Sequence, residues 1–183
     1  MELANACLWL ACFLQFGMSA QAVAMAVLSF LALGLAVMDA EIMLLPDAFV
    51  LPGIALGIVW SAVSADGHWL RAVGLSVLQA AAAALLILLI RWIYWLVRRK
   101  EGMGLGDVKL YAMLAAWLGP QEALLIFFLA VIGGALYGVF VISRLRQRAA
   151  TARVPLGSFL CMAALYAIFA GPQTIAWYLG FFR

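Results

Sequence analysis

Charged side chains are scarce in this sequence: Asp, Glu, Lys and Arg make up 10% of its 183 residues, against 69% hydrophobic residues. Soluble domains contain about 25% charged residues, so this composition excludes an ordinary water-soluble protein. A membrane helix needs about 20 apolar residues, which leaves room for about six or seven crossings and for no sizeable soluble domain. The sequence therefore predicts a protein that lies almost entirely in lipid.

Residues that bind metals or serve as nucleophiles are also scarce. The three cysteines, Cys7, Cys12 and Cys161, lie in apolar segments without Cys-x-x-Cys spacing, and His68 is the only histidine. A zinc site needs clustered ligands, and a catalytic serine or cysteine needs a base beside it, so the sequence offers neither. We expect no metal and no cofactor, and we interpret His68 as a solvated loop residue.

What the sequence does contain is a series of apolar runs separated by glycine, proline and charge. They predict an all-α bundle of about seven transmembrane helices in one domain, residues 1–183. The predicted helices are 2–16, 19–39, 47–64, 69–97, 106–118, 121–143 and 155–182. The first run lacks a basic start and a cleavage site, so we expect a membrane helix rather than a signal peptide. Gly171 and Pro172 predict a kink in the last helix.

The basic residues gather in two connections between the predicted helices. One contains Arg98, Arg99, Lys100 and Lys109, and the other contains Arg144, Arg146, Arg148 and Arg153. Cytoplasmic loops are enriched in Lys and Arg, so the N-terminus is expected in the cytoplasm and the C-terminus in the periplasm. Such short clusters are topology signals beside membrane lipid, and we expect no nucleic-acid partner. The connection from Asp39 to Asp47 then shares the cytoplasmic face.

That connection carries three acids, Asp39, Glu41 and Asp47, and no basic residue. An ionisable group at the end of an apolar helix is costly at the membrane boundary, which favours a functional role for Asp39. Asp47 follows Pro46 and also fits the N-cap of the next helix. Glu41 also fits a solvated loop charge. For these two acids, the choice between a structural role and support of a site stays open.

Three glycines precede the fifth predicted helix at alternate positions, Gly102, Gly104 and Gly106, and Asp107 follows them. Glycine permits close approach of backbone or substrate, which fits a second part of a site. The segment fits equally a flexible loop that caps the helix with Asp107. Residues 106–118 extend only about 20 Å, less than a full hydrocarbon core. Either the bilayer thins here or Asp107 lies below the interface.

Asp39 and Asp107 are therefore candidate partners on one membrane face. Two carboxylates that meet across a water support peptide hydrolysis, because one accepts a proton from the water and the other, protonated, polarises the scissile carbonyl. The ends of the predicted helices favour Asp107 as the base and Asp39 as the proton holder. Lys109 is expected either to anchor in lipid phosphate or to bind nearby carboxylates.

Three stretches occur in order along the chain: Asp39 with Leu45-Pro46-Asp47, Gly104-Leu105-Gly106-Asp107-Val108-Lys109-Leu110 leading to Ala116-Trp117-Leu118-Gly119, and Val154-Pro155-Leu156-Gly157. This pattern resembles the bacterial type IV prepilin peptidases, which are intramembrane aspartyl proteases with a Gly-x-Gly-Asp signature. The resemblance implies an inner-membrane enzyme with Asp39 and Asp107 as the catalytic pair. It also implies substrates that are pilin or pseudopilin precursors, cut at the cytoplasmic face after a glycine.

The sequence departs from the longer members of that family in two places. Those members carry a further helix and a tetracysteine zinc loop before the region where this sequence begins, and they methylate the new N-terminus. We therefore expect peptidase activity without methylation. Leu156 and Ser158 stand where the family more often has phenylalanine and proline, so we expect only a structural turn there, with Pro155 in the first turn of a helix.

Five further residues are expected to support the site or bind substrate: Gly104, Gly106, Lys109, Glu41 and Asp47. The leader of such a substrate is basic, and Glu41 and Asp47 are expected to attract it, because opposite charges steer encounter. The alternative function is a non-enzymatic membrane assembly factor, or a small transporter that uses the same polar cavity. Full cleavage by the Asn variants of both aspartates would rule out the aspartyl mechanism.

Overall fold

The computed structural model describes residues 2–65, 67–99, 104–145 and 155–181, and in these ranges it has seven α-helices and no strand. The helices are α1 (Glu2–Phe16), α2 (Ala20–Ile42), α3 (Asp47–Val63), α4 (Trp69–Arg98), α5 (Leu105–Leu118), α6 (Pro120–Leu145) and α7 (Leu156–Gly180). The predicted all-α architecture of about seven helices is confirmed. Of the residues that carry the predicted topology and motifs, six lie outside the described residues: Lys100, Gly102, Arg146, Arg148, Arg153 and Val154.

Four of the described helices, α2, α4, α6 and α7, are long and apolar enough to cross a membrane. Helices α1 and α3 are apolar but shorter, and α5 has 14 residues. Large apolar side chains lie on the outside of the bundle; Leu85, Phe128 and Trp177 are 66%, 60% and 70% exposed. A soluble monomer rarely leaves so much apolar surface in contact with water. The chain is a multi-pass membrane protein.

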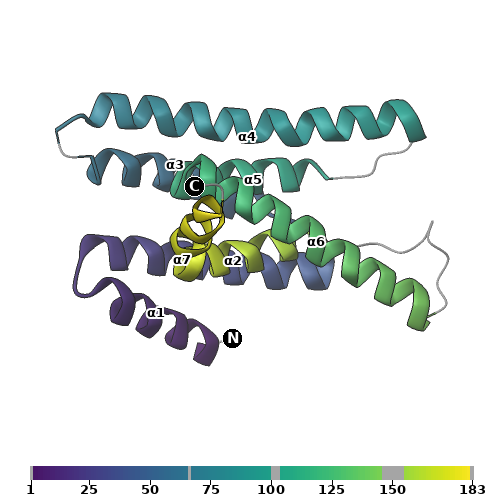
Figure 1. Ribbon diagram of the computed structural model, residues 1–183, viewed down its shortest axis with the longest axis horizontal. Helices are drawn as coiled ribbons and strands as arrows, with labels where there is room; N and C mark the ends of the chain where they lie inside the picture. The colour runs from purple at the N-terminus through teal and green to yellow at the C-terminus, as the bar shows by residue number, and fades with distance from the viewer. Residues whose placement is uncertain (1, 66, 100–103, 146–154, 182–183) are drawn as a thin grey trace.

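The helices form two groups (Figure 1). Helices α3, α4 and α5 pack against one another and make up the first, which we call the α5 group. The second, the α7 group, consists of α1, α2, α6 and α7, in which α7 packs chiefly against α2 and α6. The two groups meet chiefly where α5 contacts α6 and α7, and α2 also contacts α3. The last turn of α2 and the first turns of α5 and α7 point to the same side, the right of Figure 1.

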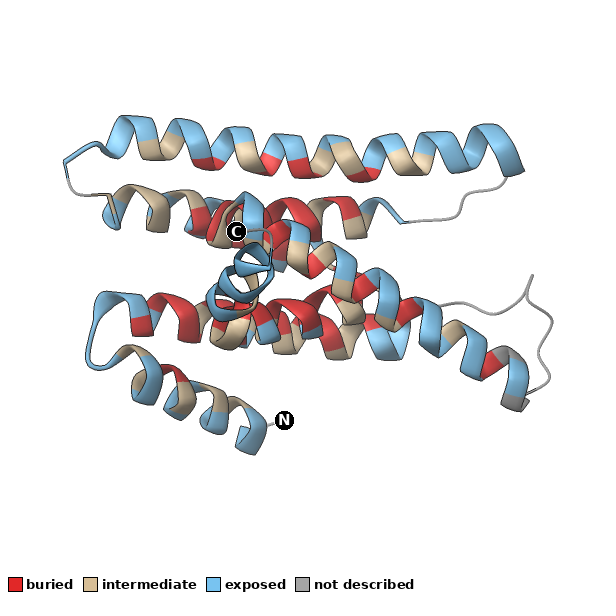
Figure 2. Ribbon diagram, in the orientation of Figure 1, coloured by how far each residue is buried: buried red, intermediate tan, exposed pale blue. Residues whose placement is uncertain are grey.

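Helix α5 is enclosed by protein rather than by lipid. Residues 110–117 are all buried, as is Val108, so no face of this stretch is left for the bilayer. A helix that is apolar on every side is typical of such a position. In Figure 2 the buried residues of α4 lie on the side that faces α3 and α5. Because neighbouring helices surround α5, its short length need not match the thickness of the hydrocarbon core.

Close packing between α3 and α5 depends on two glycines in α3. A Cβ atom on Gly57 would lie 2.6 Å from the Trp117 ring, and one on Gly53 would overlap the sulfur of Met113. The indole Nε1–H of Trp117 donates to the Gly53 carbonyl over 2.8 Å. Helix α4 also bonds to α5, because the hydroxyl of Ser76 donates to the Ala116 carbonyl over 3.0 Å. These contacts fix α5 relative to both neighbours.

The predicted end of the second helix is wrong by three residues. The prediction ended the helix at Asp39, but α2 continues to Ile42 and stops where Met43 takes a left-handed conformation with φ 51°. The N–H of Met43 still donates to the Asp39 carbonyl over 2.9 Å, which closes the last turn. No glycine or proline follows Asp39 until Pro46, so nothing local stops the helix sooner. Asp39 therefore projects from the last turn rather than from a loop.

Helix α7 continues through Pro172, as predicted. Its later part leaves the direction of the first part in Figure 1. The hydroxyl of Thr174 donates to the Ala170 carbonyl over 2.8 Å and also pairs with the Tyr166 hydroxyl over 2.8 Å. Side-chain hydroxyls near a proline can bond carbonyls of the interrupted helix, so this turn stays helical.

Candidate active site

Asp39 is held at the meeting point of α2 and α7 and is 5% exposed. Its Oδ2 atom accepts two hydrogen bonds from Ser158, one from the backbone N–H over 2.6 Å and one from the hydroxyl over 3.0 Å. Ser158 is the third residue of α7, and the N-cap residue of that helix, Pro155, provides no side-chain cap. Asp39 belongs to α2, yet it accepts a hydrogen bond from an N–H in the first turn of α7. It therefore does for α7 what an N-cap side chain would do.

Gly157 allows this approach between the two helices. A Cβ atom on Gly157 would lie 2.9 Å from both Cγ and Oδ2 of Asp39, closer than real Cβ atoms come. Gly157 is buried in the first turn of α7. Any side chain at this position would therefore displace the Asp39 carboxylate or separate α2 from α7.

Asp107 is the third residue of α5 and is partly buried. Its carboxylate lies close to the backbone of Gly104, the N-cap residue of the same helix, which favours the charged form of Asp107. A carboxylate at the third helical position that reaches back toward the N-cap backbone has the position that a capping box uses. The capping alternative raised by the sequence is thus compatible with a role in a site, because the same carboxyl also lies near Asp39.

The two predicted catalytic carboxyls lie close enough to interact electrostatically. Both carboxyls also lie close enough to the buried Cys161 thiol of α7 to interact with it electrostatically. Leu45, which is 9% exposed, lies between the two helix starts. A Cβ atom on Gly106 would be 3.1 Å from the Leu45 Cβ, and one on Gly157 would be 3.1 Å from its Cδ1. The structure therefore brings Asp39, Asp107 and Gly106 together around one apolar side chain.

Lys109 contacts a carboxylate at the exposed edge of this cluster. Its Nζ atom donates to both oxygens of Asp47, over 2.8 Å to Oδ1 and 2.7 Å to Oδ2. This is the contact with a carboxylate that was one of the two roles expected for Lys109. The N-cap alternative for Asp47 is wrong by one residue, because Pro46 holds the N-cap position and Asp47 is the first residue of α3.

Glu41 lies in the last turn of α2 and is exposed. It follows Asp39 by two positions, so its side chain leaves the helix on another side, away from the contact with Ser158. Its exposed position is compatible with both a solvated charge and an encounter with a charged substrate.

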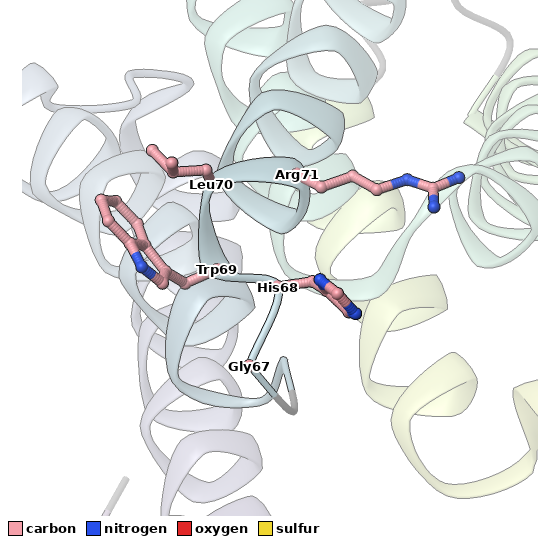
Figure 3. A pocket seen from close by; sticks show the side chains of 5 residues that line it. All are labelled: Gly67, His68, Trp69, Leu70 and Arg71. Carbon is pink, nitrogen blue, oxygen red and sulfur yellow. The ribbon is translucent and has the colours of Figure 1, made fainter.

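His68 lies far from the carboxyl pair along the chain and is exposed at the start of α4. Figure 3 shows the pocket there, lined by Gly67, His68, Trp69, Leu70 and Arg71, with His68 pointing away from Trp69 and Leu70. The described part of the chain contains no cluster of His, Cys, Asp and Glu that could hold a metal ion. The cysteines described above are free thiols.

Three residues around the carboxyl pair were not among the predicted site residues: Leu45, Gly157 and Ser158. Residues 155–158 were expected to form only a structural turn. One local signal points to Ser158: it lies in the first turn of a helix whose N-cap residue, Pro155, has no side chain that could cap it. Nothing in the local sequence indicates that the partner of Ser158 comes from α2. Gly157 belongs to a sequence motif, but the need for glycine there comes from its contact with Asp39, 118 residues earlier.

The fold and this cluster define a class: an all-helical, multi-pass membrane protein with two interacting carboxyls where two helix groups meet. The chain belongs to the type IV leader peptidase family, whose model matches residues 25–139. That stretch includes both Asp39 and Asp107, whereas Ser158 lies outside it.

Three curated relatives show how far the similarity extends. The prepilin leader peptidase/N-methyltransferase of Pseudomonas putida is 36% identical over 162 residues, which cover 88% of this chain and 54% of that protein. The protein of the same name from Stutzerimonas stutzeri is 36% identical over 173 residues (92% and 56%), and that from Escherichia coli K12 is 35% identical over 133 residues (73% and 56%). The chain spans about half the length of these relatives. No solved structure matches it.

Proposed function

We propose that the chain is an aspartic endopeptidase that removes the leader peptide of type IV prepilins or pseudopilins. The observation that carries the proposal is the carboxyl pair: Asp39 from the α7 group and Asp107 from the α5 group interact in a chain of the leader peptidase family. Neither helix group could build this pair alone. The names of the relatives, which join peptidase and methyltransferase activities, support the substrate class.

The reaction needs one water and one proton shared by the pair. The ionised carboxylate takes a proton from the water, and the water oxygen attacks the scissile carbonyl carbon. The protonated carboxyl donates to the carbonyl oxygen as charge develops there. The C–N bond then breaks, the leaving amine takes the proton that came from the water, and the second carboxyl recovers its own. The pair returns to its starting state without a cofactor.

The surrounding residues have supporting roles in this proposal. Gly106 lets Leu45 approach the start of α5, and Gly104 supplies the backbone contact that orients Asp107. The pair of Lys109 and Asp47 joins α5 to α3 beside the site. Since Lys109 already neutralises Asp47, Glu41 is the better candidate for attracting a basic leader.

We place the chain in the bacterial inner membrane as a single domain, residues 1–183, with the N-terminus in the cytoplasm. The C-terminus then lies in the periplasm, and the carboxyl pair lies at the cytoplasmic face. The lysine and arginine bias supports this orientation. The partners are then the prepilin, whose apolar helix lies in the bilayer, and membrane lipid.

The test is cleavage of a purified prepilin by the chain reconstituted in phospholipid vesicles, with the product mass determined at the junction after the leader. Wild type should cleave after the glycine, and Asp39→Asn and Asp107→Asn should each be inactive. Glu122→Gln is the control, because Glu122 lies in the first turn of α6, beyond the other end of α5, and should cleave normally. Full cleavage by either Asn variant contradicts the mechanism, and absence of cleavage by wild type favours a non-enzymatic role.

A further inference from the structure

The hydroxyl of Ser158 lies between two acceptors from α2. Its Oγ atom is 2.8 Å from the carbonyl oxygen of Ala36 and 3.0 Å from Oδ2 of Asp39. A serine hydroxyl has one hydrogen to donate, so it cannot donate to both oxygens at once. Which acceptor receives the hydrogen therefore depends on whether Oδ2 carries a proton of its own.

The backbone N–H of Ser158 has no such choice. It can only donate, and it points to the same Oδ2 over 2.6 Å; such a bond is stronger when its acceptor is ionised. As the third residue of α7, it also belongs to the helix end that carries partial positive charge. Both features stabilise a negative charge on Asp39.

We propose that Ser158 is a positioning residue that keeps Asp39 ionised as the general base of the pair. This inference rests on the proposed peptidase function and adds the assignment of roles within it. In the resting state the hydroxyl and the N–H both donate to Oδ2. When Asp39 takes the proton from water, the hydroxyl turns to the Ala36 carbonyl and loses no hydrogen bond.

The other titratable groups facing Asp39 support this assignment. Asp107 faces it from α5 and Cys161 from α7, and neither brings a positive charge. Lys109, the cation that follows Asp107 by two residues, binds Asp47 instead. Asp107 lies beside the backbone of Gly104 alone, whereas Oδ2 of Asp39 has two donors within hydrogen-bond distance. When two neighbouring carboxyls share a proton, the one with more donors keeps the charge.

The ends of the predicted helices favour the opposite roles, because Asp39 lies at the carbonyl end of its own helix. In the folded protein the amide end of a second helix, α7, also lies beside Asp39. Asp39 lies near the last carbonyls of α2 but bonds directly to an N–H of α7, and a direct bond outweighs the field of a helix end.

The test compares three variants in the reconstituted cleavage assay, with kcat and KM measured across pH. Ser158→Ala removes the hydroxyl and keeps the N–H, and Ser158→Thr keeps both. Ser76→Ala is the matched control, since its hydroxyl also donates across helices, but to a carbonyl far from the pair. Thermal unfolding of each variant shows whether it is folded.

We expect Ser158→Ala to move the acidic limb of the kcat profile to higher pH by about one unit, as losing a bond to a charged group implies. At pH values below that limb, kcat of Ser158→Ala should be about tenfold lower than kcat of wild type, with KM unchanged. Ser158→Thr should restore the profile, and Ser76→Ala should not move it. If Ser158→Ala does not fold, Ser158→Cys, a weak donor of similar size, replaces it with the same expectation.

An unmoved acidic limb in a folded Ser158→Ala or Ser158→Cys variant overturns the inference, even if kcat falls. The same holds if Ser158→Thr behaves like Ser158→Ala. These results leave the proposed function intact as long as Asp39→Asn and Asp107→Asn stay inactive. Failure of the proposed function would look different, because wild type itself would not cleave.

Discussion

The α7 group and the α5 group each supply one carboxyl, but they hold it in different ways. Asp107 lies beside the backbone of Gly104, three residues earlier in its own helix start. Asp39 accepts both of its bonds from Ser158, 119 residues later and on another helix. The first carboxyl is oriented by local sequence and the second by tertiary packing. The position of Asp39 should therefore be the more sensitive to how α2 and α7 pack.

Gly157→Ala should have the largest effect. The added Cβ would lie 2.9 Å from the Asp39 carboxylate, so α2 and α7 must separate or the carboxylate must turn away. Overpacking of this kind costs about 1–3 kcal/mol of stability, and a misplaced catalytic group costs about 100-fold in kcat. Cleavage kinetics and thermal unfolding check both numbers.

The control for this prediction is Gly34→Ala, which lies in α2 itself and has open space around the new methyl group. It should cleave as wild type does. Normal activity of folded Gly157→Ala would show that Asp39 does not depend on close packing with α7.

Gly106→Ala should have a smaller effect on the α5 side. Its Cβ would meet the Leu45 Cβ at 3.1 Å, a tight contact with a side chain that can shift. We expect roughly a tenfold loss of kcat, because Leu45 can shift and Asp107 keeps its local position beside Gly104.

Gly104→Ala is the comparison within the same motif. Its Cβ would lie 3.7 Å from Oδ2 of Asp107, an ordinary contact, so activity should stay near the wild-type value. Equal losses in Gly104→Ala and Gly106→Ala would mean that the segment needs backbone freedom rather than space beside Leu45.

Lys109→Gln should change turnover only a few-fold. The side chains of Lys109 and Asp47 are 39% and 56% exposed, and such ion pairs contribute about 0–1 kcal/mol. Asp47→Asn should give the same loss, and the double variant should lose no more than either single variant. Independent losses would assign Lys109 or Asp47 a second role, such as contact with substrate. The measurement is kcat at low and high salt, because screening should reduce the difference.

Chelation should have the smallest effect. Hydrolysis by two carboxylates and a water supplies the acid, the base and the nucleophile without a metal ion. Cleavage by the reconstituted chain should therefore continue after incubation with EDTA. A loss of activity that Zn²⁺ restores would place a metal in the reaction and require a different account of Asp39 and Asp107.

Much of this arrangement could be predicted from local sequence. The apolar runs predicted the seven helices to within a few residues, because each run is bounded by charge, glycine or proline. The Gly-x-Gly-Asp motif located Asp107, whose contact with Gly104 lies within one helix start. The end of α2 was less predictable, since Met43 adopts a left-handed conformation without a glycine to signal it.

Contacts between distant segments could not be predicted in the same way. Ser158 appears in the sequence as an ordinary residue after Pro155, and its effect on Asp39 depends on the crossing of α2 and α7. The burial of α5 depends likewise on α3 and α4 enclosing it, which the length of its apolar run does not reveal. For this reason the helix ends alone favour Asp107 as the base, whereas the hydrogen bonds from Ser158 to Asp39 favour Asp39.

The most direct test of the account is whether Asp39 and Asp107 act as one unit. The measurement is kcat for Asp39→Asn, Asp107→Asn and the double variant in the same vesicles. Residues that act together give non-additive losses, so each single variant should be as inactive as the double variant. If the two losses multiply instead, or if either single variant keeps substantial activity, the carboxyls work independently and the paired mechanism is contradicted.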